Sequence, residues 1–190
     1  MIPIVAPISG DPVGAGLVTS LARPGGNVTG LSMQDTEISA KRLELLREAL
    51  PKLARVAILR DPAGPTAGVA ATEAAARSLG LTGHVVTARR PEDFESALDA
   101  AKRVRADALV VLASSVFNTQ RMRLVDLVAR QRLPAMYEHR LWAADGGLMS
   151  YGPDLADVSR RSAVYVDKIR RGARPADLPM EQPTKFRPGD

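Results

Sequence analysis

Short runs of strand-forming residues alternate with longer helical segments along this chain of 190 residues, and that alternation restricts its fold more than any other feature. The runs are almost wholly apolar, which is typical of parallel strands covered by helices on both faces. The pattern therefore predicts an α/β fold built on a doubly wound, mainly parallel sheet. We expect strands at residues 2–7, 55–59, 82–88, 108–112, 133–137 and 147–151.

The predicted helices are bounded by recognisable start and stop signals. Asp11-Pro12 offers an N-cap followed by proline, and Arg23-Pro24-Gly25-Gly26 ends the helix that begins there. Gly80 and Gly172 stand just beyond two other helices, as glycines at helix C-termini do. The expected helices are 11–22, 37–50, 66–79, 91–105, 118–131 and 154–171.

Two extended segments, 27–32 and 149–153, are interpreted as crossings between two lobes. The part of the chain that they enclose carries enough strands and helices for one complete lobe, whereas the remainder is too small for a sheet of its own. We therefore expect three parts. Residues 1–32 are a remnant of the first lobe with the first crossing, 33–148 are the second α/β lobe, and 149–190 hold the second crossing, a first-lobe helix and a tail.

Composition restricts the function rather than the fold. The chain has 26 basic and 21 acidic residues, a net charge of +5, but its arginines are scattered beside Asp and Glu as on ordinary solvated surfaces. We therefore expect no nucleic-acid partner. The absence of cysteine excludes disulfides and thiol chemistry. No apolar run is long enough for a membrane span or a secretory signal peptide.

Catalytic and metal-binding patterns are not found either. The two histidines are His84, within a strand run, and His139, which we place in a surface turn beside Glu138 and Arg140. A serine nucleophile would need one of them as its base, and neither a Gly-x-Ser-x-Gly elbow nor a Walker loop is present. We expect no catalytic residue, no metal and no cofactor, and a small α/β enzyme is the least favoured function.

The ligand of a doubly wound lobe binds beyond the carboxyl ends of the strands, where the strand order reverses. Here that point lies between the first and third strands of the enclosed lobe, from which the loops 60–66 and 113–118 emerge. Both loops lead into helix N-termini, where backbone N–H groups attract anions. The candidate ligand-binding residues in these loops are Asp61, Thr66, Ser114 and Ser115.

Three further candidates come from outside those loops. Tyr137 and Tyr151 each close a strand run, where an aromatic ring either stacks on a ligand or, more often, packs in the core. Asp11 follows the first strand and either contacts the ligand or only caps the next helix. The same alternative applies to Ser114 and Ser115, since hydroxyls suit capping as well as ligand binding.

Four long motifs carry a resemblance to one family. They are Gly-Asp-Pro-Val-Gly-Ala-Gly-Leu-Val at 10–18, Leu-Ala-Arg-Pro-Gly-Gly-Asn-Val-Thr-Gly-Leu-Ser at 21–32, Lys-Arg-Leu-Glu-Leu-Leu-Arg-Glu-Ala-Leu-Pro at 41–51 and Gly-Gly-Leu-Met-Ser-Tyr-Gly-Pro at 146–153. The chain closely resembles the ABC transporter substrate-binding family that includes tryptophan-binding members. The likeness continues through 165–169 and 175–179 to Lys185-Phe186.

The resemblance implies a type I periplasmic binding fold, in which two lobes joined by crossing strands close on a small solute and deliver it to an ABC permease. It implies a periplasmic location, an amino acid or related organic solute, and a first-lobe loop at 9–13 that faces the cleft. Family members have a signal sequence and further elements before the segment that matches Ile2 to Ala6, so much of the first lobe is expected to be missing. The alternative function is a ligand-sensing domain of a regulator, which the same fold also serves.

A final expectation concerns self-association. The residues of one mainly apolar helix face recur at helical spacing. If only the strand 2–7 and the helix 11–22 cover that face, an apolar patch and an unpaired strand edge remain. We therefore expect the chain alone to be oligomeric, aggregation-prone or partly disordered outside residues 33–148. The residues of the face are Leu155, Val158, Ser162, Tyr165 and Ile169.

Overall fold

The computed structural model describes residues 1–32 and 35–189, and the chain divides into two compact units. Unit 1 consists of Met1–Asp35 and Pro153–Phe186, and unit 2 consists of Thr36–Gly152 and Arg187–Asp190. The chain therefore passes from one unit to the other after residues 35, 152 and 186.

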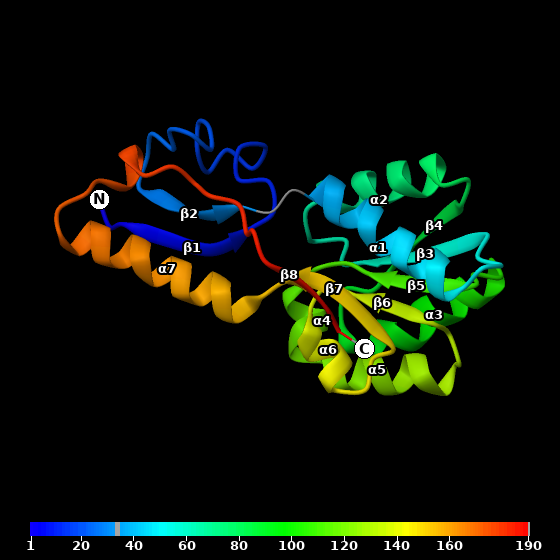
Figure 1. Ribbon diagram of the computed structural model, residues 1–190. Coiled ribbons are helices and arrows are strands. Elements are labelled where there is room, and N and C mark those ends of the chain that lie inside the picture. The colour runs from blue at the N-terminus through cyan, green and yellow to red at the C-terminus, as the bar shows by residue number, and fades with distance from the viewer. Residues whose placement is uncertain (33–34, 190) are drawn as a thin grey trace. The chain divides into compact units, whose positions relative to one another are not determined.

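Unit 2 is built on a twisted parallel sheet (Figure 1). Its strands lie in the order β4-β3-β5-β6-β7, with β8 (Phe186–Gly189) beside β7. β3 pairs in parallel with both β4 and β5, so the strand order reverses between β3 and β5, as the sequence predicted. The five strands are β3 (Arg55–Arg60), β4 (Thr82–Thr87), β5 (Ala108–Val111), β6 (Ala135–Tyr137) and β7 (Met149–Pro153).

Helices cover both faces of this sheet (Figure 1). β3 alternates between two cores, since Ala57 and Leu59 belong to one apolar cluster and Val56 and Ile58 to the other. The first core contains residues of α3 to α6, and the second contains residues of α1 and α2. The helices are α1 (Asp35–Ala49), α2 (Ala67–Ser78), α3 (Phe94–Arg103), α4 (Ser115–Thr119), α5 (Arg121–Arg130) and α6 (Arg140–Ala144), with a 3₁₀ turn η1 (Pro91–Asp93) before α3.

The helix expected at 118–131 is two helices in the structure. α4 begins earlier than predicted because Ser114 caps it, and Gln120 separates it from α5 with φ −110° and ψ 20°. This break matters for function because it leaves α4 as a short turn that begins near the carboxyl ends of the strands.

Unit 1 contains a two-stranded parallel sheet of β1 (Ile4–Ser9) and β2 (Val28–Ser32). The expectation that this part of the chain is too small for a sheet of its own is therefore wrong, because the segment predicted as a crossing pairs with the first strand. α7 (Leu155–Arg170) packs against both strands. Glu181 pairs in parallel beside β2: its carbonyl accepts from Ser32 N–H (2.9 Å), and its N–H donates to the Gly30 carbonyl (3.0 Å). A 3₁₀ turn, η2 (Pro175–Asp177), precedes that segment. In the described part of the chain, no strand pairs with the other edge of β1.

α7 confirms the helix predicted at 154–171. Asp154 caps it by accepting hydrogen bonds from the N–H groups of Ala156 (3.0 Å) and Asp157 (3.3 Å). Val158 and Tyr165 are buried, as expected for the predicted apolar face, and the Tyr165 hydroxyl donates to the Pro179 carbonyl.

The prediction of a helix at 11–22 is wrong. Residues 12–16 form a single turn, in which Ala15 N–H donates to the Asp11 carbonyl and Gly14 N–H donates to Asp11 Oδ1. Gly16 has φ +69°, a left-handed conformation that ends the turn. Asp11-Pro12 does start a turn, but the glycines at 14 and 16 lower the helix propensity too far for that turn to continue as a helix.

Two absences are found within residues 1–32 and 35–189. No helix there has the length and apolar character needed to cross a membrane. Nor do His, Asp and Glu side chains of the described segments gather into a group that could hold a metal ion.

Candidate ligand-binding site

Two loops meet at the carboxyl ends of β3 and β5, the neighbouring strands between which the strand order reverses. Asp61 follows β3 directly, and Ser114 follows β5 after a short link. The Ser114 hydroxyl donates a hydrogen bond to Asp61 Oδ2 at 3.0 Å. The structure thus brings together two residues that the sequence indicated, at the point where a doubly wound sheet binds its ligand.

The loop that carries Asp61 is braced by its own side chains. Asp61 Oδ1 accepts a hydrogen bond from the N–H of Ala63 at 2.9 Å. The Arg60 guanidinium donates to the carbonyls of Asp61 (3.3 Å), Pro62 (3.2 Å) and Gly64 (3.3 Å). Because both ends of the loop are tied in this way, the Asp61 carboxylate has a fixed direction before any ligand arrives.

Ser114 also performs the capping role that the sequence left open. Its backbone is extended, and its Oγ accepts a hydrogen bond from the N–H of Val116 at 3.1 Å, which starts α4. Ser115, the first residue of α4, is exposed to solvent. Thr66 precedes α2, is exposed and makes no side-chain capping bond. The hydroxyls of Ser115 and Thr66 are therefore accessible to a ligand.

A second polar cluster lies at the end of β6. Asn118 Nδ2 donates to Glu138 Oε1 at 2.6 Å, and Asn118 Oδ1 lies 3.0 Å from His139 Nε2. Since the Asn118 oxygen can only accept, His139 Nε2 carries the proton and donates to it. The side chains of Glu138 and His139 are 10% and 12% exposed, so this network is largely withdrawn from water.

The surroundings of His139 keep it neutral. Burial, together with the nearby cations Arg121 and Arg42, lowers the pKa of His139 from 6.5 to about 4. In the part of the chain that the structure describes, its Nδ1 is buried without a hydrogen-bond partner. At neutral pH the cluster therefore offers one carboxylate, one amide and one neutral imidazole.

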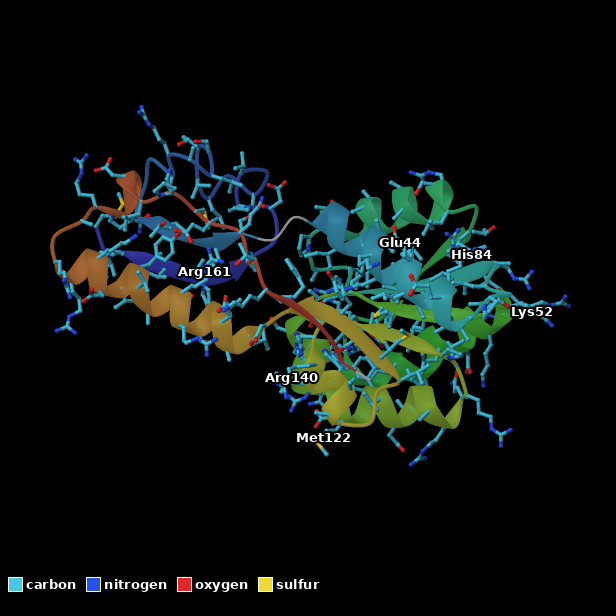
Figure 2. The ribbon with its side chains drawn as sticks, in the orientation of Figure 1. Glu44, Lys52, His84, Met122, Arg140 and Arg161 are labelled. Carbon is cyan, nitrogen blue, oxygen red and sulfur yellow. The ribbon has the colours of Figure 1, made fainter. Side chains whose placement is uncertain are left out.

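The sequence pointed away from this second cluster. We expected His139 in a surface turn, but it is held between Asn118 and the first turn of α6, whose first residue, Arg140, is labelled in Figure 2. The signal that could have found it was available. Glu138 and His139 directly follow a buried strand, which is the same rule that selected Asp61.

The remaining sequence candidates lie elsewhere. Tyr137 is 1% exposed, and its ring stacks on Trp142 with centroids 4.8 Å apart inside the core. Of the two alternatives left open for this residue, the structure therefore shows core packing, and its placement among the ligand-binding candidates is wrong. Tyr151 is half-buried, packs against the second core and contributes its carbonyl to a bond with Arg42. Asp11 belongs to unit 1 and is exposed, with Oδ1 bonded to Gly14 N–H at 2.8 Å.

The arrangement suits binding better than catalysis. The Ser114 hydroxyl donates to Asp61, so it is not paired with a histidine base as an activated nucleophile would be. Carboxylate oxygens, exposed hydroxyls and an amide are the groups that hydrogen-bond the N–H and O–H groups of a small polar solute.

A doubly wound lobe with such polar groups at its switch point is typical of α/β proteins that bind small molecules, and the fold of this chain is that of a type I periplasmic binding protein. The family assignment is direct. The model of the ABC transporter substrate-binding protein family matches residues 1–187, and the chain belongs to that family.

Individual relatives share parts of this architecture. A tyrosine-binding protein of Clostridioides difficile (strain R20291) is 45% identical over 58 residues, which make up 30% of this chain and 16% of that protein. The crystal structure of an ABC domain in complex with L-Trp from Streptococcus pneumoniae has a TM-score of 0.87 at 24% identity, covering 98% of this chain and 64% of that one. This chain thus spans less than two thirds of either protein.

A class of regulators also shares the fold. The structure of a LacI family transcriptional regulator from Arthrobacter in complex with lactose has a TM-score of 0.68 at 14% identity, covering 97% of this chain and 67% of that one.

Proposed function

We propose that this chain is the solute-binding component of an ABC import system and that its ligand is an amino acid or a related organic solute. One observation carries the proposal: the pair Asp61–Ser114 and the cluster Asn118–Glu138–His139 both stand at the carboxyl ends of the parallel sheet. A solute with ammonium or other N–H groups finds acceptors in both. The L-Trp complex and the tyrosine-binding relative support this ligand class.

The mechanism proposed is binding followed by closure. A solute held by unit 2 would be enclosed by rotation of the two units about the segments that join them, and the closed form would be delivered to a permease outside the cytoplasm. Exposed hydroxyls of Ser115 and Thr66 and the carboxylate of Asp61 would make the first contacts. Asp11 of unit 1 would then complete the site.

A calorimetric titration tests the proposal. The unmodified chain is titrated with L-tryptophan, L-tyrosine, L-leucine and lactose, and binding of at least one amino acid is expected. Replacing Ser114 and Ser115 together by alanine is expected to weaken that binding about tenfold or more, from ~0.5–1.5 kcal/mol for each hydrogen bond lost. Unchanged affinity of the double variant would remove these loops from the site.

The matched control is Ser78→Ala. Ser78 ends α2 near the start of β4, at the amino end of the sheet, and its hydroxyl donates to the Ala75 carbonyl of its own helix. Its removal should leave solute affinity unchanged. Because Ser114 also caps α4, urea unfolding of each variant separates a loss of affinity from a loss of folded protein.

The second candidate function is a ligand-sensing domain of a regulator, which the likeness to the LacI family structure supports. The titration panel separates the two. Lactose binding with no response to amino acids would favour the regulator.

A further inference from the structure

One buried charge in unit 2 lies close enough to the second polar cluster to lower the pKa of His139. Arg42 lies on α1 and is 6% exposed. Burial of a guanidinium is costly unless its N–H groups are all satisfied, so its position calls for a specific role. The hydrogen bonds of Arg42 indicate what that role is.

Arg42 ties the residue that follows β6 to the middle of β7. Its Nε donates to the Tyr151 carbonyl of β7 at 2.8 Å, and its Nη2 donates to the Glu138 carbonyl just after β6 at 3.1 Å. Hydrogen bonds from a charged donor are stronger than those between neutral groups. A single side chain therefore fixes the backbone at two points that α6 separates in sequence.

Close packing at the next residue makes this junction tighter. A Cβ placed on Gly152 would lie 1.7 Å from the Glu138 carbonyl oxygen and 3.5 Å from Arg42 Nη2. No side chain other than hydrogen fits there. Gly152 is also the residue after which the chain leaves unit 2 and enters unit 1.

The same junction reaches the candidate site through one residue. The Glu138 carbonyl accepts a hydrogen bond from Arg42, and the Glu138 Oε1 accepts one from Asn118. Asn118 is in turn bonded to His139. Displacing the backbone of Glu138 would therefore displace the carboxylate and the hydrogen bonds that orient it. Arg42 therefore links the residue that carries this carboxylate to Tyr151, which directly precedes Gly152, where the chain leaves unit 2.

We propose that Arg42 is a positioning residue that couples the ligand-binding carboxylate of Glu138 to the hinge at Gly152. The proposal rests on the function proposed above and adds to it. When the chain bends at Gly152 during closure, the shared bonds of Arg42 move the Glu138 backbone with it. Ligand bound at Glu138 restrains the hinge in return, since coupling is reciprocal.

The test uses Arg42→Met, which keeps an apolar stem of similar length without the donors, and Arg42→Lys, which keeps the charge but not the two-armed geometry. Arg47→Met is the matched control, because Arg47 lies on the same helix and is exposed. Two measurements need no ligand: amide hydrogen exchange, and the NMR titration of His139.

Arg42→Met is expected to speed exchange about tenfold or more at residues 150–152 and 138–139, with smaller effects on β3 and β5. It is also expected to move the His139 titration to higher pH, because one neighbouring cation has gone. Arg42→Lys should restore part of the protection, and Arg47→Met should change neither quantity. Uniformly faster exchange over all of unit 2 would show a merely structural role and overturn the proposal.

A ligand measurement completes the test. With L-tryptophan or L-tyrosine as probe, whichever the unmodified chain binds, Arg42→Met should raise Kd about tenfold or more, mainly through faster dissociation. Gly152→Ala perturbs the same junction from its other side and should reproduce both the local exchange and the loss of affinity. Arg42→Lys, which keeps the buried charge, serves if Arg42→Met fails to fold. Unaltered exchange at 138–139 in Gly152→Ala would contradict the coupling.

The two proposals can fail separately. If the unmodified chain binds no amino acid, the proposed ligand class is wrong, while the exchange pattern still decides whether Arg42 links Glu138 to Gly152. If the chain binds an amino acid but Arg42→Met binds it equally well, the solute-binding function stands and the coupling does not.

Discussion

Acidification should destabilise unit 2 through one histidine. His139 is neutral in the fold, with a pKa of about 4, whereas the same group in the unfolded chain has a pKa of 6.5. Between these two values the unfolded chain binds a proton that the folded chain does not, so folding stability falls as the pH falls. The gap corresponds to about 3 kcal/mol, lost progressively from pH 6.5 to pH 4 and constant above that window.

The assay combines two probes of the same unit. Trp142, the single tryptophan, is buried in the core of unit 2, so its fluorescence during urea unfolding reports the stability of that unit at each pH. NMR of the His139 ring gives its pKa directly, and His84→Gln assigns the signal because it leaves one histidine.

The comparison that decides the matter is His139→Gln, which keeps an N–H donor for Asn118 but does not titrate. We expect the unmodified chain to lose about 3 kcal/mol more than this variant between pH 6.5 and pH 4. Equal losses in the two chains would refute the reasoning, since the acid sensitivity would then belong to other groups.

Three further outcomes are expected. Gly147→Ala should destabilise unit 2 by about 1–3 kcal/mol in the same fluorescence assay, because its Cβ would lie 2.7 Å from Tyr137 Cε2 and 2.8 Å from the Trp142 carbonyl; an unchanged urea midpoint would contradict this. Asp154→Ala removes the cap of α7, so it should lower the free energy of unfolding by about 1 kcal/mol and speed amide exchange at the start of that helix. Exchange equal to that of the unmodified chain would show the cap to be unimportant. The chain alone should self-associate in size-exclusion chromatography with light scattering, because β1 has an unpaired edge within the described residues and Ile2 and Ile4 are 82% and 49% exposed; a stable monomer that binds solute would argue against it.

The fold of unit 2 could be predicted because its signals are local. Strands such as β3 and β5 are continuous apolar runs, and their order follows from the rules of doubly wound sheets. The segment after β1 could not be predicted in that way. Asp11-Pro12 is the kind of sequence that begins a helix, and here it begins a single turn. Whether such a turn continues depends on how strongly the glycines at 14 and 16 disfavour the helix.

The candidate site was predictable where function follows from position along a strand, and not where it depends on distant partners. Asp61 and Ser114 are adjacent because their strands pair. For Tyr137 the sequence indicates a strand end, but the stacking partner Trp142 decides that its ring faces the core. Glu138 and His139 become a buried cluster because Asn118 and Arg42 approach them from other elements, which a linear pattern does not reveal.

The central claim is that solute binds unit 2 at the carboxyl ends of its strands, and an NMR titration tests it most directly. Isotopically labelled chain is titrated with L-tryptophan and with L-tyrosine, and backbone shifts are followed residue by residue. We predict the largest changes at Asp61, Ser114, Ser115 and Glu138, with saturation at a common Kd. The opposite end of the sheet provides the contrast, since a cavity of about 300 Å³ lies there beside Leu133 and Leu148. Saturable shifts confined to that cavity, with the carboxyl-end residues unmoved, would contradict the account.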